Sequence, residues 1–138
     1  MNYNEKVMEN FRHPKNVGKI KDADGIGEVG NPVCGDILIL YIKVGKRKSN
    51  GKEEKYIKDI KFSTLGCAAA IAVSSMITQM AKGKTLAKAE KISNKEIVNE
   101  LGDLPKIKYH CSLLGAEALH LAIEDYKNKK MRNIKSKN

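Results

Sequence analysis

The sequence predicts a single α+β domain in which a small three-stranded antiparallel sheet packs against about five helices. Two observations indicate strands. Residues 37–44 form a nearly continuous apolar run, and residues 56–65 alternate apolar and polar side chains around Ile60 and Phe62. A third observation indicates helices, because apolar residues recur at helical spacing on both sides of these strands. With 138 residues the chain is long enough for one compact core and too short for two domains.

The N-terminal segment is predicted to be a short helix followed by a connection rich in glycine. Apolar residues at helical spacing mark this helix, namely Tyr3, Val7, Met8 and Phe11. The helix ends at His13, because the residue before Pro14 avoids the α region. Residues 26–30 are predicted to add a short strand to the sheet. The polar residues 45–55, with Gly51 among them, are predicted to form a long hairpin loop between the other two strands.

The second half of the chain is predicted to be helical. Residues 67–81 carry no charge, which predicts a helix that is buried on most sides. One or two short amphipathic helices follow, and a last helix with an apolar stripe covers residues 110–127. The domain therefore extends over residues 1–129. Residues 130–138 hold basic side chains and no acid, so a disordered tail is expected there.

The net charge of +10 favours acidic partners, yet several features exclude whole classes of function. Of the 26 basic residues 23 are Lys, aromatic residues are few and no recognition motif is present, so nucleic acid is not the expected partner. The 20 uncharged residues between Lys61 and Lys82 are long enough for a membrane span, but scattered Ser, Thr and Gln side chains and Gly66 argue against one. No secretory signal opens the chain, and an odd number of cysteines fits the reducing cytoplasm.

The three cysteines occupy similar local positions although they are far apart in the sequence. Cys34 lies in a turn before a strand, Cys67 follows Gly66 at a strand-to-helix junction, and Cys111 begins the last helix. A helix N-terminus favours the thiolate, which is the form that binds metals and attacks electrophiles. The separations of 33 and 44 residues exclude the C-x2-C patterns of zinc ribbons and ferredoxins. Only the tertiary fold can bring these thiols together.

Two interpretations of the cysteines remain open at this point. Cysteine is among the residue types most often buried, so all three can be small core residues. Alternatively, Asp36 lies two residues after Cys34 and His110 directly precedes Cys111. Three thiolates with one imidazole or carboxylate supply the four ligands of a tetrahedral site, which suits zinc or a small iron–sulfur cluster.

Four linked motifs resemble those of the U-type iron–sulfur cluster assembly scaffolds, IscU and the N-terminal domain of NifU. The motifs are H-P-K-N-V-G at residues 13–18, V-G-N-P-V-C-G-D at residues 29–36, F-S-T-L-G-C-A-A-A-I-A-V-S-S at residues 62–75 and H-C-S-L-L at residues 110–114. They occur in the family's order and extend the resemblance to about residue 129. The resemblance implies a SufE/NifU-like fold and the role of a scaffold rather than an enzyme.

The resemblance also implies a site and a sequence of steps. Cys34, Cys67 and Cys111 bind the nascent cluster, or Zn2+ in the isolated protein, and Asp36 and His110 compete for the remaining position. A cysteine desulfurase of the IscS or NifS type delivers sulfur as a persulfide on Cys111, while Fe2+ occupies the site. An electron donor such as ferredoxin reduces the persulfide, and the transient [2Fe-2S] cluster passes to apo-proteins. As a weak oxygen ligand among thiolates, Asp36 is expected to keep the cluster labile.

Two further comparisons of motifs narrow these expectations. Many IscU proteins bind a dedicated Hsp70-type chaperone through L-P-P-V-K, whereas residues 104–108 are L-P-K-I-K, which argues against chaperone dependence.

The alternative function is that of a zinc-dependent sulfur acceptor of the SufU type, which serves a cysteine desulfurase as a sulfurtransferase. That class has an insertion between its second and third cysteines and usually lacks the histidine. The 44-residue separation and His110 therefore favour the scaffold.

Overall fold

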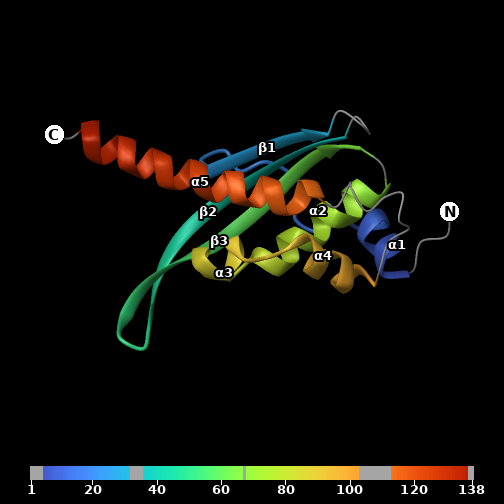
Figure 1. Ribbon diagram of the computed structural model, residues 1–138, viewed down its shortest axis with the longest axis horizontal. Helices are drawn as coiled ribbons and strands as arrows, with labels where there is room; N and C mark the ends of the chain where they lie inside the picture. The colour runs from blue at the N-terminus through green and yellow to red at the C-terminus, as the bar shows by residue number, and fades with distance from the viewer. Residues whose placement is uncertain (1–4, 32–35, 67, 103–112, 137–138) are drawn as a thin grey trace.

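The computed structural model describes residues 5–31, 36–66, 68–102 and 113–136 (Figure 1). The elements follow one another as α1 (Glu5–Arg12), β1 (Gly25–Asn31), β2 (Asp36–Ser49), β3 (Lys52–Leu65), α2 (Ala68–Ala81), α3 (Leu86–Glu90), α4 (Asn94–Leu101) and α5 (Leu113–Ser136). The three strands form one antiparallel sheet in the order β1-β2-β3. The predicted α+β class and the three-stranded sheet with its helices are confirmed.

The core lies between one face of the sheet and the helices that cover it. Pairing places Gly27 beside Leu40 and Leu40 beside Phe62, so these residues share the covered face. Leu40 and Phe62 are at most 1% exposed, and α2 and α5 lie across this face (Figure 1). The continuous apolar pattern of β2 follows from its central place in the sheet, where both faces are partly covered.

The β2–β3 hairpin is longer than the sequence predicts. The prediction of a long loop at residues 45–55 is wrong. The strands continue to Ser49 and restart at Lys52, and the two residues between them have φ angles of 53° and 77°. These angles belong to a two-residue type I′ turn, for which Asn-Gly is the preferred sequence. The signal was therefore present at Asn50 and Gly51. Oppositely charged cross-strand pairs also favour extended strands there.

Close contact between β1 and α5 depends on two glycines. A Cβ atom on Gly27 would lie 2.1 Å from the backbone oxygen of Ala118, and a Cβ atom on Gly25 would lie 2.1 Å from that of Ala122. Real side chains do not tolerate such distances, so only glycine allows the helix to pack this closely on the strand. As β1 advances from Gly25 to Gly27, the contact on α5 moves back by four residues. The helix therefore runs antiparallel to the strand.

The helix ends in the described part follow local signals. Ser93 caps α4 by accepting the backbone N–H of Glu96, and Gly102 ends the helix with a φ of 81°. The structure differs from the predicted last helix, since α5 continues to Ser136 through the segment expected to be a disordered tail. That segment contains neither Gly nor Pro to stop a helix. None of the helices in the described ranges has the length and apolar character needed to cross a membrane.

Candidate metal centre

One of the five predicted ligands lies among the described residues. Asp36 is the first residue of β2, where its backbone pairs with Asn31 of β1. Cys34, Cys67, His110 and Cys111 lie outside the described residues, as do residues 104–108. The set of ligands therefore stays a prediction, and its support comes from the residues that flank it.

The residues flanking Cys34 and Cys67 lie at the same end of the sheet. Asn31 and Asp36, on either side of the first cysteine, are paired across β1 and β2. The next residue of β2, Ile37, pairs with Leu65, which is the last residue of β3. Neighbouring strands are about 4.8 Å apart. The chain therefore leaves this end of the sheet at Leu65 one strand away from Asp36, and α2 begins three residues later at Ala68.

The start of α5 points toward the same end. Because α5 runs antiparallel to β1 from the contact between Gly27 and Ala118, its first residue, Leu113, lies in the direction of Asn31. Five helical residues span about 7.5 Å and four strand residues about 13 Å, so the helix begins within roughly 6 Å of the level of Asn31. The segments that contain the three cysteines thus attach to the fold at one end. Figure 1 shows this end on the right, away from the β2–β3 turn and the C-terminus.

Residues 13–18 hold together the two elements that flank Cys67. The backbone N–H of Phe62 in β3 donates to the carbonyl of Asn16 (2.9 Å), and Gly18 donates to the carbonyl of Phe62 (2.8 Å). The Asn16 side chain also donates to the hydroxyl of Thr78 in α2 (3.0 Å). The H-P-K-N-V-G motif therefore has a positional role, since it links the strand before Cys67 to the helix after it. From the sequence, His13 is predicted only to end a helix.

A buried polar network, which the sequence analysis does not predict, fixes α1 on α2. The hydroxyl of Ser75, which is fully buried, donates to the side-chain oxygen of Asn10 in α1 (2.7 Å) and accepts the backbone N–H of Lys15 (2.9 Å). The side-chain amide of Gln79 donates to the same Asn10 oxygen (2.8 Å). Polar residues one turn apart on an otherwise apolar helix were the signal for this network.

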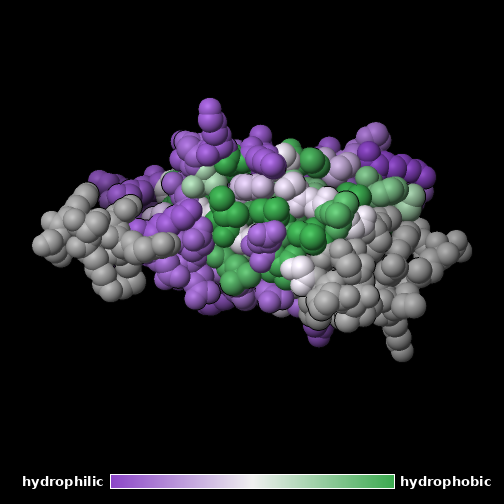
Figure 2. All heavy atoms as spheres, turned by 90° about the horizontal axis from the view of Figure 1, so that it is seen from above, coloured by the Kyte–Doolittle hydropathy of each residue, from purple (hydrophilic) through white to green (hydrophobic). Residues whose placement is uncertain are grey.

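The end of the sheet next to the candidate site also exposes apolar side chains. Leu65 is 71% exposed and Ile37, its partner across the strands, is 39% exposed. Ile26 of β1 is a further exposed apolar residue, at 41%. Figure 2 shows a hydrophobic area in the middle of the face that contains β1. Exposed apolar areas of this kind mark contact surfaces for other proteins.

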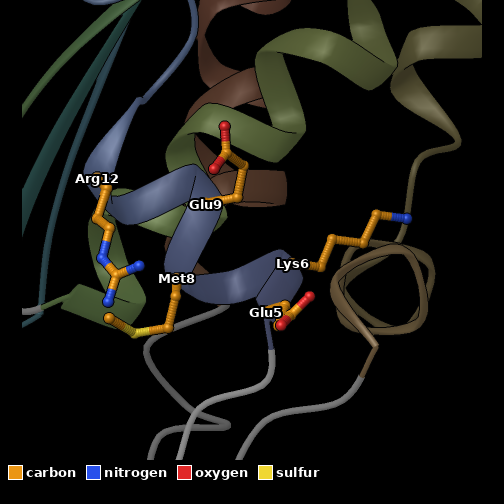
Figure 3. A pocket seen from close by; sticks show the side chains of 5 residues that line it. All are labelled: Glu5, Lys6, Met8, Glu9 and Arg12. Atoms are coloured by element: carbon orange, nitrogen blue, oxygen red, sulfur yellow. The ribbon is translucent and has the colours of Figure 1, made fainter.

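Other features of the described residues do not form a competing site. The hollow in Figure 3, about 680 Å³, is lined by side chains that point in different directions from α1, namely Glu5, Lys6, Met8, Glu9 and Arg12. Within the described ranges no three His, Cys, Asp or Glu side chains are placed to share a metal ion. His120 is exposed and contacts the carbonyl of Glu90.

Among the described residues, an ion pair between β2 and the connection that leads into β1 has a resolved effect on titration. The Lys43 ammonium group donates to the carboxylate of Asp22 (3.0 Å), and this hydrogen bond holds the pKa of Asp22 below its ordinary value. The same bond raises the pKa of Lys43. Asp24 also pairs with Lys43 (3.6 Å) and accepts the backbone N–H of Val44 (2.7 Å). These contacts attach the connection to β2 and so serve the fold.

Comparison with known proteins assigns the family. The model of the family described as NifU-like N terminal domain matches residues 2–133. The chain belongs to this family. This match covers nearly the whole sequence, as the four motifs imply.

Proteins named as iron-sulfur cluster assembly scaffolds are similar to this chain over nearly its full length. Iron-sulfur cluster assembly scaffold protein IscU 1 of Archaeoglobus fulgidus is 56% identical over 135 residues, which are 96% of this chain and 83% of the relative. The IscU scaffold protein of Aquifex aeolicus is 49% identical over 94% of this chain and 79% of its own. That of Escherichia coli is 44% identical over 94% of this chain and 98% of its own.

Solved structures share the fold. An iron-sulfur cluster assembly scaffold protein for the SUF system from Fervidobacterium islandicum has a TM-score of 0.69 and 26% identity, and the match covers 88% of this chain and 96% of that one. The N-terminal part of a nitrogen-fixing NifU-like protein from Brucella abortus has a TM-score of 0.65 at 19% identity, over 91% and 94% of the two chains. The expected NifU-like fold is therefore confirmed.

Proposed function

We propose that this member of the NifU-like N-terminal family is a scaffold on which a [2Fe-2S] cluster is assembled and from which it is transferred to apo-proteins. The proposal is supported by the residues that flank the three cysteines, which lie at one end of the sheet, in a chain 44–56% identical to proteins named IscU scaffolds. The cluster is cargo, so the chain acts as a carrier rather than an enzyme.

The proposed ligands are Cys34, Cys67 and Cys111, with His110 or Asp36 at the remaining position. Thiolates are soft ligands that hold iron–sulfur clusters, whereas a carboxylate oxygen binds such iron more weakly. An oxygen ligand therefore favours release, which a scaffold requires. The cytoplasm, as a reducing compartment, keeps the three thiols free for this chemistry.

Assembly requires a sulfur donor and a source of electrons. In the proposed sequence the Cys111 thiolate attacks the outer sulfur of the persulfide on a cysteine desulfurase. The S–S bond of the desulfurase breaks, its cysteine leaves as a thiolate, and Cys111 holds the persulfide. Reduction of two such sulfur atoms to sulfide takes four electrons. Oxidation of two Fe2+ ions to Fe3+ supplies two of them, and an electron donor such as a ferredoxin supplies the other two. The exposed apolar residues beside the site, Ile37 and Leu65, offer these partners a surface to contact.

Anaerobic reconstitution tests the proposal directly. The protein is incubated with Fe2+, L-cysteine, a cysteine desulfurase and an electron donor, and the visible spectrum is followed before and after addition of an apo-ferredoxin. We expect a [2Fe-2S] chromophore that disappears from this protein as the ferredoxin acquires it. Cys34→Ser, Cys67→Ser and Cys111→Ser should each lose the chromophore. Bound Zn2+ with sulfur transfer but no chromophore would instead establish the SufU-type sulfur acceptor.

The role of Asp36 has its own test. Asp36→Ala should give a cluster that persists longer and transfers more slowly, because the weak oxygen ligand is lost. Asp59→Ala is the matched control, since Asp59 lies on β3 and pairs with Lys82 (3.5 Å). Cluster loss from Asp36→Ala at the rate of the unsubstituted protein would exclude the role in release.

A further inference from the structure

The turn of the β2–β3 hairpin presents an Asn-Gly pair to solvent. Asn50 and Gly51 are both exposed, and the hairpin extends beyond the helices at this point (Figure 1). A Cβ atom on Gly51 would have no heavy atom within 4 Å apart from the chain next to it. Water therefore has free access to the asparagine side chain and to the backbone that follows it.

The backbone N–H of Gly51 takes no part in the hydrogen bonds of the hairpin. The last pair of the ladder joins Ser49 to Lys52, and the two turn residues lie between them. Among the described residues, the N–H of Gly51 has no acceptor. Amides outside a helix or ladder lose their protons to water more readily than those inside one.

This arrangement allows the asparagine side chain to react with the chain itself. The nitrogen of Gly51 gives up its proton and attacks the Cγ carbon of Asn50, which closes a five-membered succinimide ring. The bond between Cγ and the side-chain nitrogen breaks, and ammonia leaves with the proton. Water then adds to either carbonyl of the ring and gives aspartate or isoaspartate at position 50. Water is the only co-reactant, and no atom changes its oxidation state.

The residues around the turn favour this attack. Glycine has no Cβ, so no side chain obstructs the approach of its nitrogen to Cγ. Nearby cations stabilise the negative charge that forms on the nitrogen. Residues 45–55 contain five basic and two acidic residues. The two acids are paired with Lys46 and Arg47, whereas Lys48 and Lys52 beside the turn have no ion-pair partner among the described residues.

We propose that Asn50 is a site of spontaneous deamidation, and that the isoaspartate formed there opens the tip of the hairpin. In isoaspartate the main chain continues through the side-chain carbon, so the turn becomes longer by one methylene group. A type I′ turn joins its strands through two residues of ordinary length. The pairs next to the turn, Ser49 with Lys52 and Lys48 with Glu53, are therefore lost.

The opening is confined to the tip. At the base of the hairpin Tyr56 forms a β-bridge with Thr85, and the N–H of Ile57 donates to the carbonyl of Lys84 (2.9 Å). Ile57 is fully buried, so the core holds the strands together from this level on. The candidate metal centre lies at the other end of the sheet. The modification therefore acts on the hairpin without depending on the proposed function.

Peptide mapping by mass spectrometry tests the modification in protein incubated at mildly alkaline pH. Asn99 is the internal control, because it is also exposed but lies within α4 and is followed by Glu100. We expect Asn50 to deamidate at least about tenfold faster than Asn99, which corresponds to a barrier lower by about 1.4 kcal/mol. Isoaspartate is located with a carboxyl methyltransferase that labels it. Asn50→Gln should lose this label at the hairpin, because glutamine would have to close a larger ring.

Equal rates at Asn50 and Asn99, or isoaspartate at the hairpin of Asn50→Gln, would overturn the proposed site. Limited trypsin digestion tests the opening, since Lys48 and Lys52 are cleavage sites. Incubated protein should be cut at the tip about tenfold faster than fresh protein, because cleavage follows the population of the opened form.

Asn50→Asp is the matched control for the opening. It adds the same negative charge without lengthening the turn, and aspartate tolerates the left-handed conformation of residue 50. We expect it to resist trypsin as fresh protein does. Cleavage of Asn50→Asp as fast as that of incubated protein would assign the effect to charge and overturn the proposed opening. Unchanged cleavage of incubated protein in which Asn50 has become isoaspartate would overturn it as well.

Discussion

Replacing Ser75 with alanine should destabilise the protein because one buried hydroxyl joins three segments of the chain. The hydroxyl donates to Asn10 of α1, accepts the backbone N–H of Lys15 and lies 3.2 Å from the side-chain amide of Gln79. Alanine removes these bonds without creating space for another polar group. The connection between α1, residues 13–18 and α2 then loses its central member.

The size of the effect follows from which groups lose their partners. The oxygen of Asn10 keeps the hydrogen bond from Gln79 (2.8 Å), so its loss is small. The N–H of Lys15 loses its acceptor in a part-buried hydrogen bond. Leaving such a donor without a partner costs about 1–3 kcal/mol, and the lost bond itself contributes about 1 kcal/mol. We expect a loss of about 2–3 kcal/mol in the free energy of unfolding. For a chain of this length that lowers Tm by roughly 6–9 °C.

Ser74→Ala is the matched control on the same helix. Ser74 is also buried, but its hydroxyl donates to the carbonyl of Ala70 (2.7 Å), which already accepts a backbone bond of the helix. Its removal should change the free energy by less than about 0.5 kcal/mol. Urea unfolding monitored by circular dichroism gives both values, and hydrogen exchange reports the amide of Lys15. Equal stability of the two variants, with the Lys15 amide still protected in Ser75→Ala, would refute the reasoning.

Three further predictions concern other parts of the fold. Gly27→Ala should destabilise by about 3 kcal/mol in urea unfolding, because its Cβ meets the backbone of Ala118 and α5 has to move away. NMR titration should give Asp22 a pKa below its ordinary value, and Lys43→Met should return the pKa toward that value. The ion pair stabilises the fold at pH values above the pKa that Asp22 has in the unfolded chain, and this stabilisation is lost as the pH falls through the pKa of Asp22 in the folded protein. Ser93→Ala should lower the unfolding free energy by about 1 kcal/mol, because α4 loses its cap.

Neighbouring residues provide controls for these variants. Glu28→Ala lies beside Gly27 on β1 but is exposed, so it should leave stability nearly unchanged. A loss from Gly27→Ala no larger than from Glu28→Ala would mean that β1 and α5 do not depend on close contact. For the acid titration, Lys46→Met removes a lysine that pairs with Glu53 instead, and an equal response of Asp22 to both lysine variants would contradict the assigned cause. For α4, an unchanged midpoint in Ser93→Ala would mean that the cap contributes nothing measurable.

Elements with strong local signals were predictable from the sequence. The apolar run of β2 and the alternation of β3 identify two strands, and Pro14, Gly83 and Gly102 mark the ends of helices. These signals act within a few residues, so they do not depend on the rest of the fold. The Asn-Gly pair at residues 50–51 was also a local signal, for a two-residue turn. The many charged residues around it led instead to the prediction of a long loop.

Features that depend on contacts between distant segments were not predictable in the same way. Ser75 and Asn10 are 65 residues apart, and nothing near either residue reveals the other. The glycines of β1 look like loop residues until the backbone of α5 is seen against them. Periodicity shows that a helix face is buried without showing what covers it.

The sequence by itself determined the family and the candidate ligands, because four motifs with three cysteines occur in one order along the chain. Only the tertiary structure decided that the residues flanking these cysteines lie at one end of the sheet. Separations of 33 and 44 residues contain no information about distance in space. The fold brings these positions together because β1, β2 and β3 pair in antiparallel fashion and α5 runs antiparallel to β1. The chain therefore returns to the same end of the sheet near each cysteine.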